Sequence, residues 1–244
     1  MPFHSVKITV VKPTENFRGM SYSEWATVWC NWLLSDIPVY DGGDMLFLRG
    51  NVNLKPVGGL EEGPRHLAQK GIYDKTGKSG ERILEGTSVL IAVIVSMLSI
   101  DDVYEGTKMR TPQQLWYCAN VDTERGDLIW ASIMKKGEKR PYRIVKDIKN
   151  YKVITPVFKL IVPDNSKLMN QIDIPMIPGE YNTVTVGYFI LIKSLSPSTY
   201  RINFGGRTGE YYTNSLYDIV VEGRRRNSLK DNSGRGVTFK QAWV

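Results

Sequence analysis

Short apolar runs, each bounded by glycine, proline, asparagine or aspartate, make up most of this 244-residue sequence. Runs of this kind are typical of strands, whereas an amphipathic helix needs a longer stretch with apolar residues three to four positions apart. The 22 glycines and 12 prolines supply many turns but are too few for a collagen-like or low-complexity chain. We therefore predict strands over most of the runs at 45–52, 88–100, 128–134, 151–162, 183–193, 199–204 and 215–221.

Two segments carry the start pattern of a helix. Ser21 and Glu24 have the spacing of a capping box, in which each side chain bonds the backbone amide of the other residue. Thr111 followed by Pro112 is a helix cap with proline at the first helical position, which predicts a short second helix reaching about Asn120.

Three tryptophans share one face of the first predicted helix. Trp25, Trp29 and Trp32 recur at helical spacing, and the helix must end before Pro38. Such a stripe docks a helix onto an apolar surface, so we expect these side chains to form a core helix. A ligand platform is the alternative.

Together these elements predict a mainly β fold, a two-sheet jelly-roll-like sandwich with an N-terminal amphipathic helix and a short second helix. The alternating segment 1–11 adds a strand. We expect residues 1–221 to form a single β-sandwich domain, interrupted by a long surface excursion over 54–86. Residues 222–244 have the composition of an extended basic C-terminal arm.

The net charge of +7 is concentrated in two segments. Residues 135–152 hold eight basic side chains against two acidic ones, and residues 222–244 hold six against two. The stretch from Lys135 to Lys152 is therefore a candidate surface for an acidic protein, nucleic acid or membrane headgroups, or else the solvent face of a hairpin. In the arm, a neighbouring chain or the domain itself is expected to bind Arg224, Arg225, Arg226, Arg235, Phe239, Lys240 and Trp243.

Histidine and cysteine offer little for catalysis. His4 and His66 stand apart from any cysteine or paired carboxylate, so no zinc site is predicted. Neither Cys30 nor Cys118 lies in a nucleophile motif, and both are expected to be buried structural thiols.

Other motifs are incomplete. The segment 71–79 resembles a phosphate-binding loop but has Ile72 where the loop needs glycine. Two acidic clusters follow apolar runs and are expected to be solvated turn residues: Asp101, Asp102 and Glu105, and Asp122, Glu124 and Asp127. We therefore expect no catalytic residues, no cofactor, no metal and no enzymatic activity.

Compartment and solubility follow from similar patterns. Two cysteines do not form a disulfide framework in a chain of this length, which favours a reducing compartment. The first residues lack the apolar run of a signal peptide. The most apolar stretch, 89–100, is shorter than the roughly 20 residues that span a bilayer. We expect a soluble protein without a transmembrane segment.

Four segments recur in one order along the chain. The Trp25–Trp29–Trp32 helix, followed by Ser35 and Pro38, precedes Met-Leu-Phe-Leu-Arg-Gly at 45–50. Further on lie the segments TPVFKLIVPDN at 155–165, GYFILIKSLSP at 187–197 and YRINFGG at 200–206. In order and approximate spacing they resemble a family of uncharacterised β-sandwich proteins of bacteria and large DNA viruses, over most of residues 20–221.

The resemblance implies a fold but transfers no catalytic residue. Many bacterial members look secreted and carry cysteines after the helix, where this chain has Gly42, Gly43 and Asp44. The viral branch therefore fits better. It implies a protein similar to the minor proteins that line and cement the capsids of large icosahedral DNA viruses, an analogy of fold rather than of site.

Three functions stay open. The leading hypothesis is a non-enzymatic structural protein, a virion or minor capsid component that contacts other capsid or assembly proteins. It would be located in the virion, assembled in the host cytoplasm, and otherwise in the cytoplasm. The second is a carbohydrate-binding or carbohydrate-active sandwich, suggested by six tryptophans, 13 tyrosines and the acidic residues at strand ends. The third is a nucleic-acid-binding module, whose affinity would fall steeply with salt.

Overall fold

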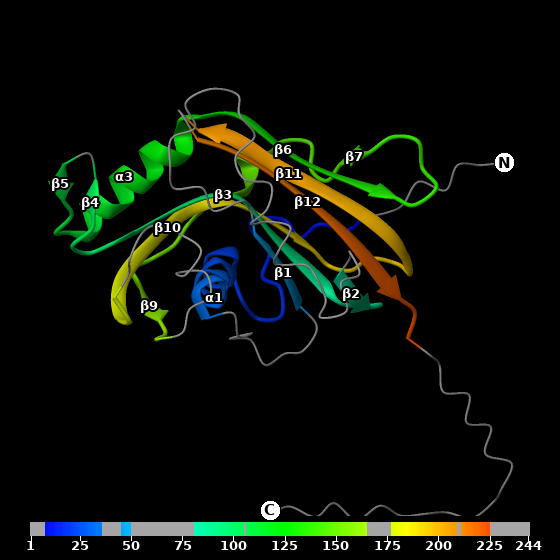
Figure 1. The fold of residues 1–244 in the computed structure, drawn as a ribbon, viewed down its shortest axis with the longest axis horizontal. Helices are drawn as coiled ribbons and strands as arrows, with labels where there is room; N and C mark the ends of the chain where they lie inside the picture. Colours follow the sequence, from blue (N-terminus) through cyan, green and yellow to red (C-terminus); the bar gives the residue numbers. More distant parts are fainter. Residues whose placement is uncertain are drawn as a thin grey trace, which may run out of the picture.

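The computed structural model describes residues 8–35, 45–49, 81–104, 106–164, 177–208 and 211–224 (Figure 1). Two α-helices, α1 (Tyr22–Ser35) and α3 (Pro112–Glu124), and the 3-10 helix η1 (Ile148–Tyr151) accompany two five-stranded sheets. The expected mainly β, two-sheet sandwich with two helices is therefore confirmed. Of the helices in the described ranges, none has the length and apolar character needed to cross a bilayer.

Each sheet combines antiparallel pairs with one parallel pair at its edge. Sheet I contains β1 (Met45–Arg49), β3 (Ser88–Ser99) and β10 (Gly179–Ile192), with β8 (Lys152–Ile154) and β9 (Phe158–Val162) both paired to β10. Sheet II runs in the order β2 (Glu81–Leu84), β12 (Tyr211–Glu222), β11 (Ser198–Thr208), β6 (Gly126–Lys135) and β7 (Tyr142–Arg143). A small hairpin joins β4 (Val103–Tyr104) and β5 (Thr107–Lys108).

Both helices begin where the sequence predicts. The backbone N–H of Ser21 donates to Glu24 Oε2 at 2.7 Å, and the Glu24 N–H donates to Ser21 Oγ at 3.4 Å, which completes a capping box. Helix α3 has a second capping box between Thr111 and Gln114, with proline at its start. It continues to Glu124 and so extends past the predicted end at Asn120.

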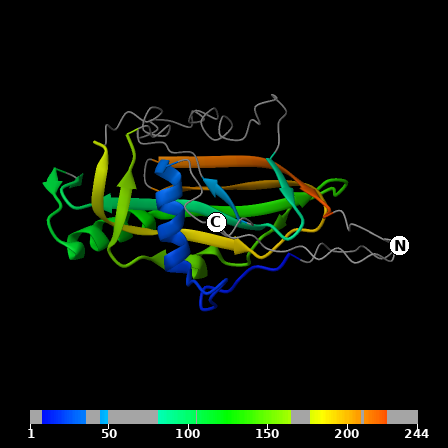
Figure 2. The same cartoon turned by 90° about the horizontal axis from the view of Figure 1, so that it is seen from below.

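Sheet I is the middle layer of the molecule. On one face it packs against α1, which crosses its strands (Figure 2). The opposite face packs against sheet II. Side chains of β3 alternate between these two layers: Val89, Ile91 and Val93 face sheet II, and Leu90 and Ala92 face α1. A strand buried on both faces needs apolar residues without interruption, and this explains the continuous apolar run in β3.

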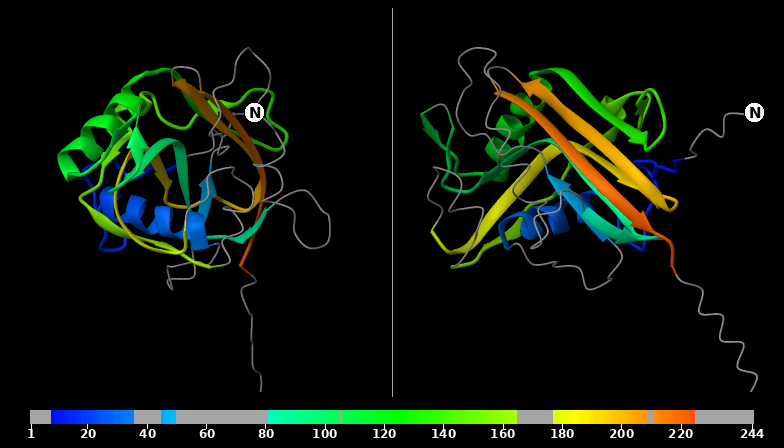
Figure 3. Two further views of the ribbon diagram at one scale, coloured as in Figure 1. Left: turned by 60° about the vertical axis from the view of Figure 1, so that its left-hand side comes forward. Right: turned by 45° about the vertical axis from the view of Figure 1, so that its right-hand side comes forward.

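Helix α3 shares the second face of sheet I with sheet II. Its residues Leu115 and Ala119 pack with Val184 and Val186, at the end of β10 that sheet II leaves uncovered. The two views in Figure 3 show α3 beside sheet II rather than beneath it.

Several segments differ from their predictions. The predicted strand over 151–162 is divided into η1, β8 and β9, with Pro156 in the break because proline cannot donate to the sheet. Strand β2 occupies the end of the expected excursion, whose residues 54–80 lie outside the described residues. Of the predicted first strand, Val10 forms a bridge with Ile192, and residues 1–7 are not described.

Candidate functional site

The tryptophans of α1 belong to the core. Trp25 is 0% exposed and Trp29 is 3% exposed. Their indole N–H groups donate to the carbonyls of Phe17 and Leu48 at 3.0 Å and 3.2 Å. Trp32 is half-buried, with its ring centroid 5.3 Å from that of Phe47. These contacts leave α1 without the exposed aromatic row that a ligand platform would need.

Only the first candidate residue of the arm falls within the described part of the chain. Arg224 Nε donates to the carbonyl of Glu85 at 2.9 Å, and the guanidinium lies over Gly86. Arg224 thus fastens the chain beyond β12 to the turn after β2. The candidates outside the described residues are Arg225, Arg226, Arg235, Phe239, Lys240 and Trp243.

The eight basic side chains from Lys135 to Lys152 comprise six exposed ones and two half-buried ones, Lys135 and Lys152. Six members are exposed, and none of the six is paired with a carboxylate among the described residues. We call them the basic strip: Lys136, Lys139, Arg140, Arg143, Lys146 and Lys149. They follow the β6–β7 hairpin and η1 along one edge of sheet II.

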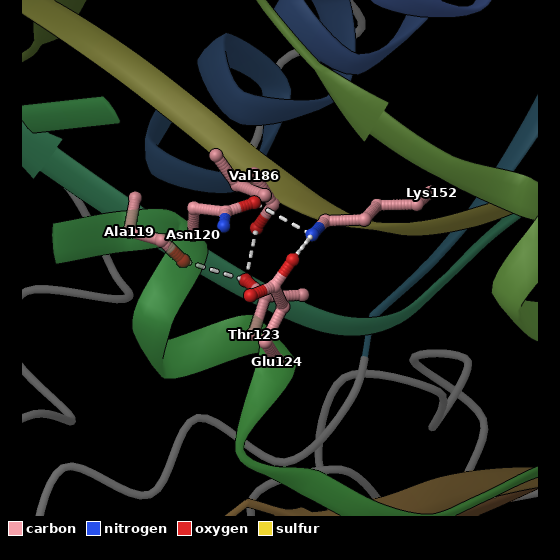
Figure 4. A network of polar contacts seen from close by, with 6 residues as sticks. All are labelled: Ala119, Asn120, Thr123, Glu124, Lys152 and Val186. Carbon is pink, nitrogen blue, oxygen red and sulfur yellow. Dashed lines mark hydrogen bonds and ion pairs between the residues drawn. The ribbon is translucent and has the colours of Figure 1, made fainter. Parts of the chain in front are cut away.

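Lys152 differs, because its ammonium group points into the fold (Figure 4). Its Nζ donates to Asn120 Oδ1 at 2.6 Å and to Glu124 Oε1 at 2.9 Å. The hydrogen bond from Lys152 holds the pKa of the Glu124 carboxyl below its usual range. Next to this pair, Thr123 Oγ1 donates to the carbonyls of Ala119 and Val186. The cluster connects α3 to β8 and β10. Lys152 therefore holds these elements together rather than binding a partner molecule.

Cys30 and the acidic residues Asp101 and Asp102 are also bonded to neighbouring groups of the fold. Cys30 is buried, with Sγ 3.1 Å from Thr185 Oγ1, and burial raises its pKa to about 12. A thiol with such a pKa stays protonated and is a poor nucleophile. Asp101 pairs with Lys108 at 2.9 Å, and Asp102 accepts the Ser99 N–H at 2.6 Å. Within the described ranges, no three His, Cys, Asp or Glu side chains are grouped so as to hold a metal ion.

A surface that the sequence did not reveal is the outer face of sheet II, the face turned away from sheet I. Trp130 of β6 lies there opposite Gly205 of β11. Its indole N–H donates to Asn203 Oδ1 at 2.8 Å, and Asn203 Nδ2 donates to Asn214 Oδ1 at 2.7 Å. The ring is therefore fixed in orientation by a chain of amides across three strands.

Trp130 was missed because the outer face of its strand is mostly apolar. Leu128, Trp130 and Met134 alternate with the inward-facing Ile129 and Ile133, and Ser132 is the one polar residue of the outer face over 128–134. The alternation from 128 to 134 separates the two faces of the strand, but it does not indicate which face is buried. The outward position of Trp130 therefore could not be predicted.

A second exposed surface lies on β8 and β9. Ile154, Val157 and Ile161 are 53%, 37% and 51% exposed, and we call them the β8–β9 apolar strip. Ile161 lies on the face of sheet I opposite to α1, because its neighbours Leu160 and Val162 pack with α1. Ile154 lies on the same face, because its neighbour Val153 packs with α1. Val157 lies in the bend between β8 and β9. Lys159 and Glu180 stand on the same face, with Nζ and Oε2 4.0 Å apart.

Asn31 of α1 closes the free edge of β9. Its Oδ1 accepts the N–H of Ile161 at 2.9 Å, and its Nδ2 donates to the carbonyl of Lys159 at 3.3 Å. One amide side chain thus takes the place of a paired strand. Any partner at this edge must contact side chains rather than extend the sheet.

Comparisons of this chain with protein-family models, with curated proteins and with solved structures found no match.

Proposed function

We propose that this protein is a non-enzymatic structural component of a large assembly, in which the β8–β9 apolar strip docks onto a second copy of the chain. The observation that carries the proposal is three exposed aliphatic side chains within the eight residues 154–161, on β8, on β9 and in the bend between them. Isolated exposed aliphatics are ordinary, whereas a grouped set beside charged residues is typical of a protein contact.

Charge supports a second copy as the partner. Lys159 and Glu180 border the strip with side chains 62% and 65% exposed. A two-fold contact places the same surface on both partners, so the lysine of one copy can face the glutamate of the other. A strip flanked by both signs of charge is therefore complementary to itself.

The setting that we propose is a virion, with this protein as a minor capsid component. The resemblance of residues 20–221 to the viral branch of the β-sandwich family supports that setting. The carbohydrate hypothesis has weaker support, because Trp25 and Trp29, on which it relied, are buried.

Sedimentation equilibrium of the full chain tests the docking. We expect concentration-dependent self-association that Ile161→Glu weakens, because a carboxylate would be buried in an apolar contact. Leu84→Glu, on an equally exposed leucine of β2, is the matched control and should leave association unchanged.

Charge reversal sharpens the test. Lys159→Glu alone should weaken association, because like charges would then meet across the contact, and adding Glu180→Lys should restore it. A chain that stays monomeric over the whole concentration range, or a double reversal that restores nothing, would contradict the proposal.

A further inference from the structure

The outer face of sheet II carries a fixed aromatic ring and exposed cations that are not paired with a carboxylate among the described residues. The register pairs Ser132 of β6 with Arg143 of β7, and the inward partner pair is Ile133 with Tyr142. Arg143 therefore projects from the outer face, diagonal to Trp130 two residues along β6. Diagonal neighbours in an antiparallel sheet are about 7–8 Å apart, within reach of long side chains.

The ring of Trp130 is held in place in the free protein. Gly205, its cross-strand neighbour, has no side chain and is itself buried, which leaves room for the indole to lie across β11. The hydrogen bond to Asn203 fixes the direction of the ring. A ligand that stacks on Trp130 therefore loses little side-chain entropy from this residue.

The outer face of sheet II also carries an amide donor and a paired acid. Asn214 is exposed and accepts from Asn203 through Oδ1, so Nδ2 is the group of this amide that can donate to a ligand. Both carboxylate oxygens of Asp218 are occupied by Arg201, through Nε at 2.8 Å and Nη2 at 2.9 Å. The charge of Asp218 is thus neutralised, and amide N–H groups can donate. A ligand rich in acceptor oxygens fits such a surface.

The basic strip continues the positive charge of Arg143 along the edge of sheet II. The stretch from Lys135 to Lys152 contains only two acidic residues, Glu138 and Asp147, and Asp147 already caps η1 by accepting the N–H of Lys149 at 3.0 Å. Phosphate groups are the acceptors that such a row of exposed lysine and arginine side chains binds best.

We propose that the outer face of sheet II binds single-stranded nucleic acid, with a base stacked on Trp130 and phosphates bound by Arg143 and the basic strip. A flat aromatic ring beside cations is how single strands are bound without sequence preference. In a duplex the base faces are covered by neighbouring pairs, so stacking on Trp130 requires an unpaired base. This activity is separate from docking through the β8–β9 apolar strip, which lies on the other sheet.

Fluorescence anisotropy with a labelled oligothymidine of about 20 nucleotides tests the proposal. We expect binding that weakens steeply between about 50 and 200 mM salt. Trp130→Ala should weaken binding by about fivefold or more at fixed salt. Arg143→Ala should lower the slope of log affinity against log salt by about 0.7, as expected for one lost phosphate contact on a single strand.

Matched controls separate stacking and phosphate contact from general effects. Tyr117→Ala removes an aromatic side chain that is 72% exposed on α3, and Lys12→Ala removes an exposed cation away from sheet II. Neither should change affinity. Trp130→Phe keeps a ring and should bind nearly as well as the unchanged protein, and thermal melts of all variants verify folding. If Trp130→Ala does not fold, Trp130→Phe and Arg143→Ala still decide the question.

Three results would overturn the proposal. One is no binding of oligothymidine at low salt. Another is equal loss of affinity in Trp130→Ala and Tyr117→Ala. The third is tighter binding of a duplex, of heparin or of phosphatidylserine vesicles than of oligothymidine, which would assign the cations to a different anionic partner.

Discussion

The hydroxyl of Ser215 lies in the core between the two sheets without a hydrogen-bond partner among the described residues. A buried polar group without a partner costs about 1–3 kcal/mol relative to one that is satisfied. We therefore expect Ser215→Ala to raise the free energy of unfolding by about 1 kcal/mol, measured by urea denaturation.

Ser99 is the control for that substitution. It is equally buried, but its Oγ is 2.7 Å from Thr183 Oγ1. Ser99→Ala should lower the free energy of unfolding by about 1 kcal/mol. Equal destabilisation by the two variants would mean that Ser215 has a partner.

Gly206 of β11 lies where sheet II packs closely against Ile94 of sheet I. A Cβ at this position would overlap Ile94 Cδ1 and would lie 2.6 Å from the carbonyl oxygen of Leu128, which is backbone and cannot move aside. We expect Gly206→Ala to lower the free energy of unfolding by about 2–3 kcal/mol through overpacking. Thermal denaturation beside Gly223→Ala checks this, since among the described residues a Cβ at Gly223 meets only Pro197, at 3.5 Å. Similar melting temperatures of the two variants would contradict the close approach.

At the level of elements, Asn31 makes the joint between α1 and β9. Asn31→Ala removes both bonds to the edge of β9, and we expect it to lower the free energy of unfolding by about 1–2 kcal/mol. It also exposes a strand edge, so light scattering should show increased aggregation on heating.

Asn182→Ala is the matched control, an exposed asparagine on the neighbouring strand β10. It should change the free energy of unfolding by less than about 0.5 kcal/mol. If Asn31→Ala behaved in the same way, the edge of β9 would not depend on α1.

The elements that were predicted correctly are those indicated by residues close together in the sequence. Both helix starts followed from short-range capping patterns at Ser21 and Thr111, and long apolar runs located β3 and β10. Strand β2 escaped prediction because Glu81, Arg82 and their neighbours hold only two apolar residues. It is held by pairing with β12 and by the Arg82–Glu222 ion pair at 2.7 Å, both of which join residues far apart in sequence.

The candidate surfaces were harder to predict because they depend on which face of each strand is covered. The basic stretch could be located from composition, but the inward turn of Lys152 requires α3 to lie beside β8. Trp130 lies on the outer face of sheet II because the other face packs on sheet I. No local sequence pattern predicts this position. Burial of a face is a property of the whole fold, so these residues needed the tertiary arrangement.

At the level of the whole molecule, sheet I is covered on one face by α1 and on the other by sheet II and α3. Amides in such a central layer exchange with solvent only when the whole fold opens, whereas edge elements open locally.

We expect the slowest hydrogen exchange at 89–93 in β3 and 188–191 in β10, with free energies of exchange equal to the global free energy of unfolding. The short β4–β5 hairpin should exchange far faster, since two residue pairs hold it together. Native-state exchange followed by NMR measures this order. Slowest exchange in β11 and β12 would instead make sheet II the stable centre, with sheet I and its helices as the layer that opens first.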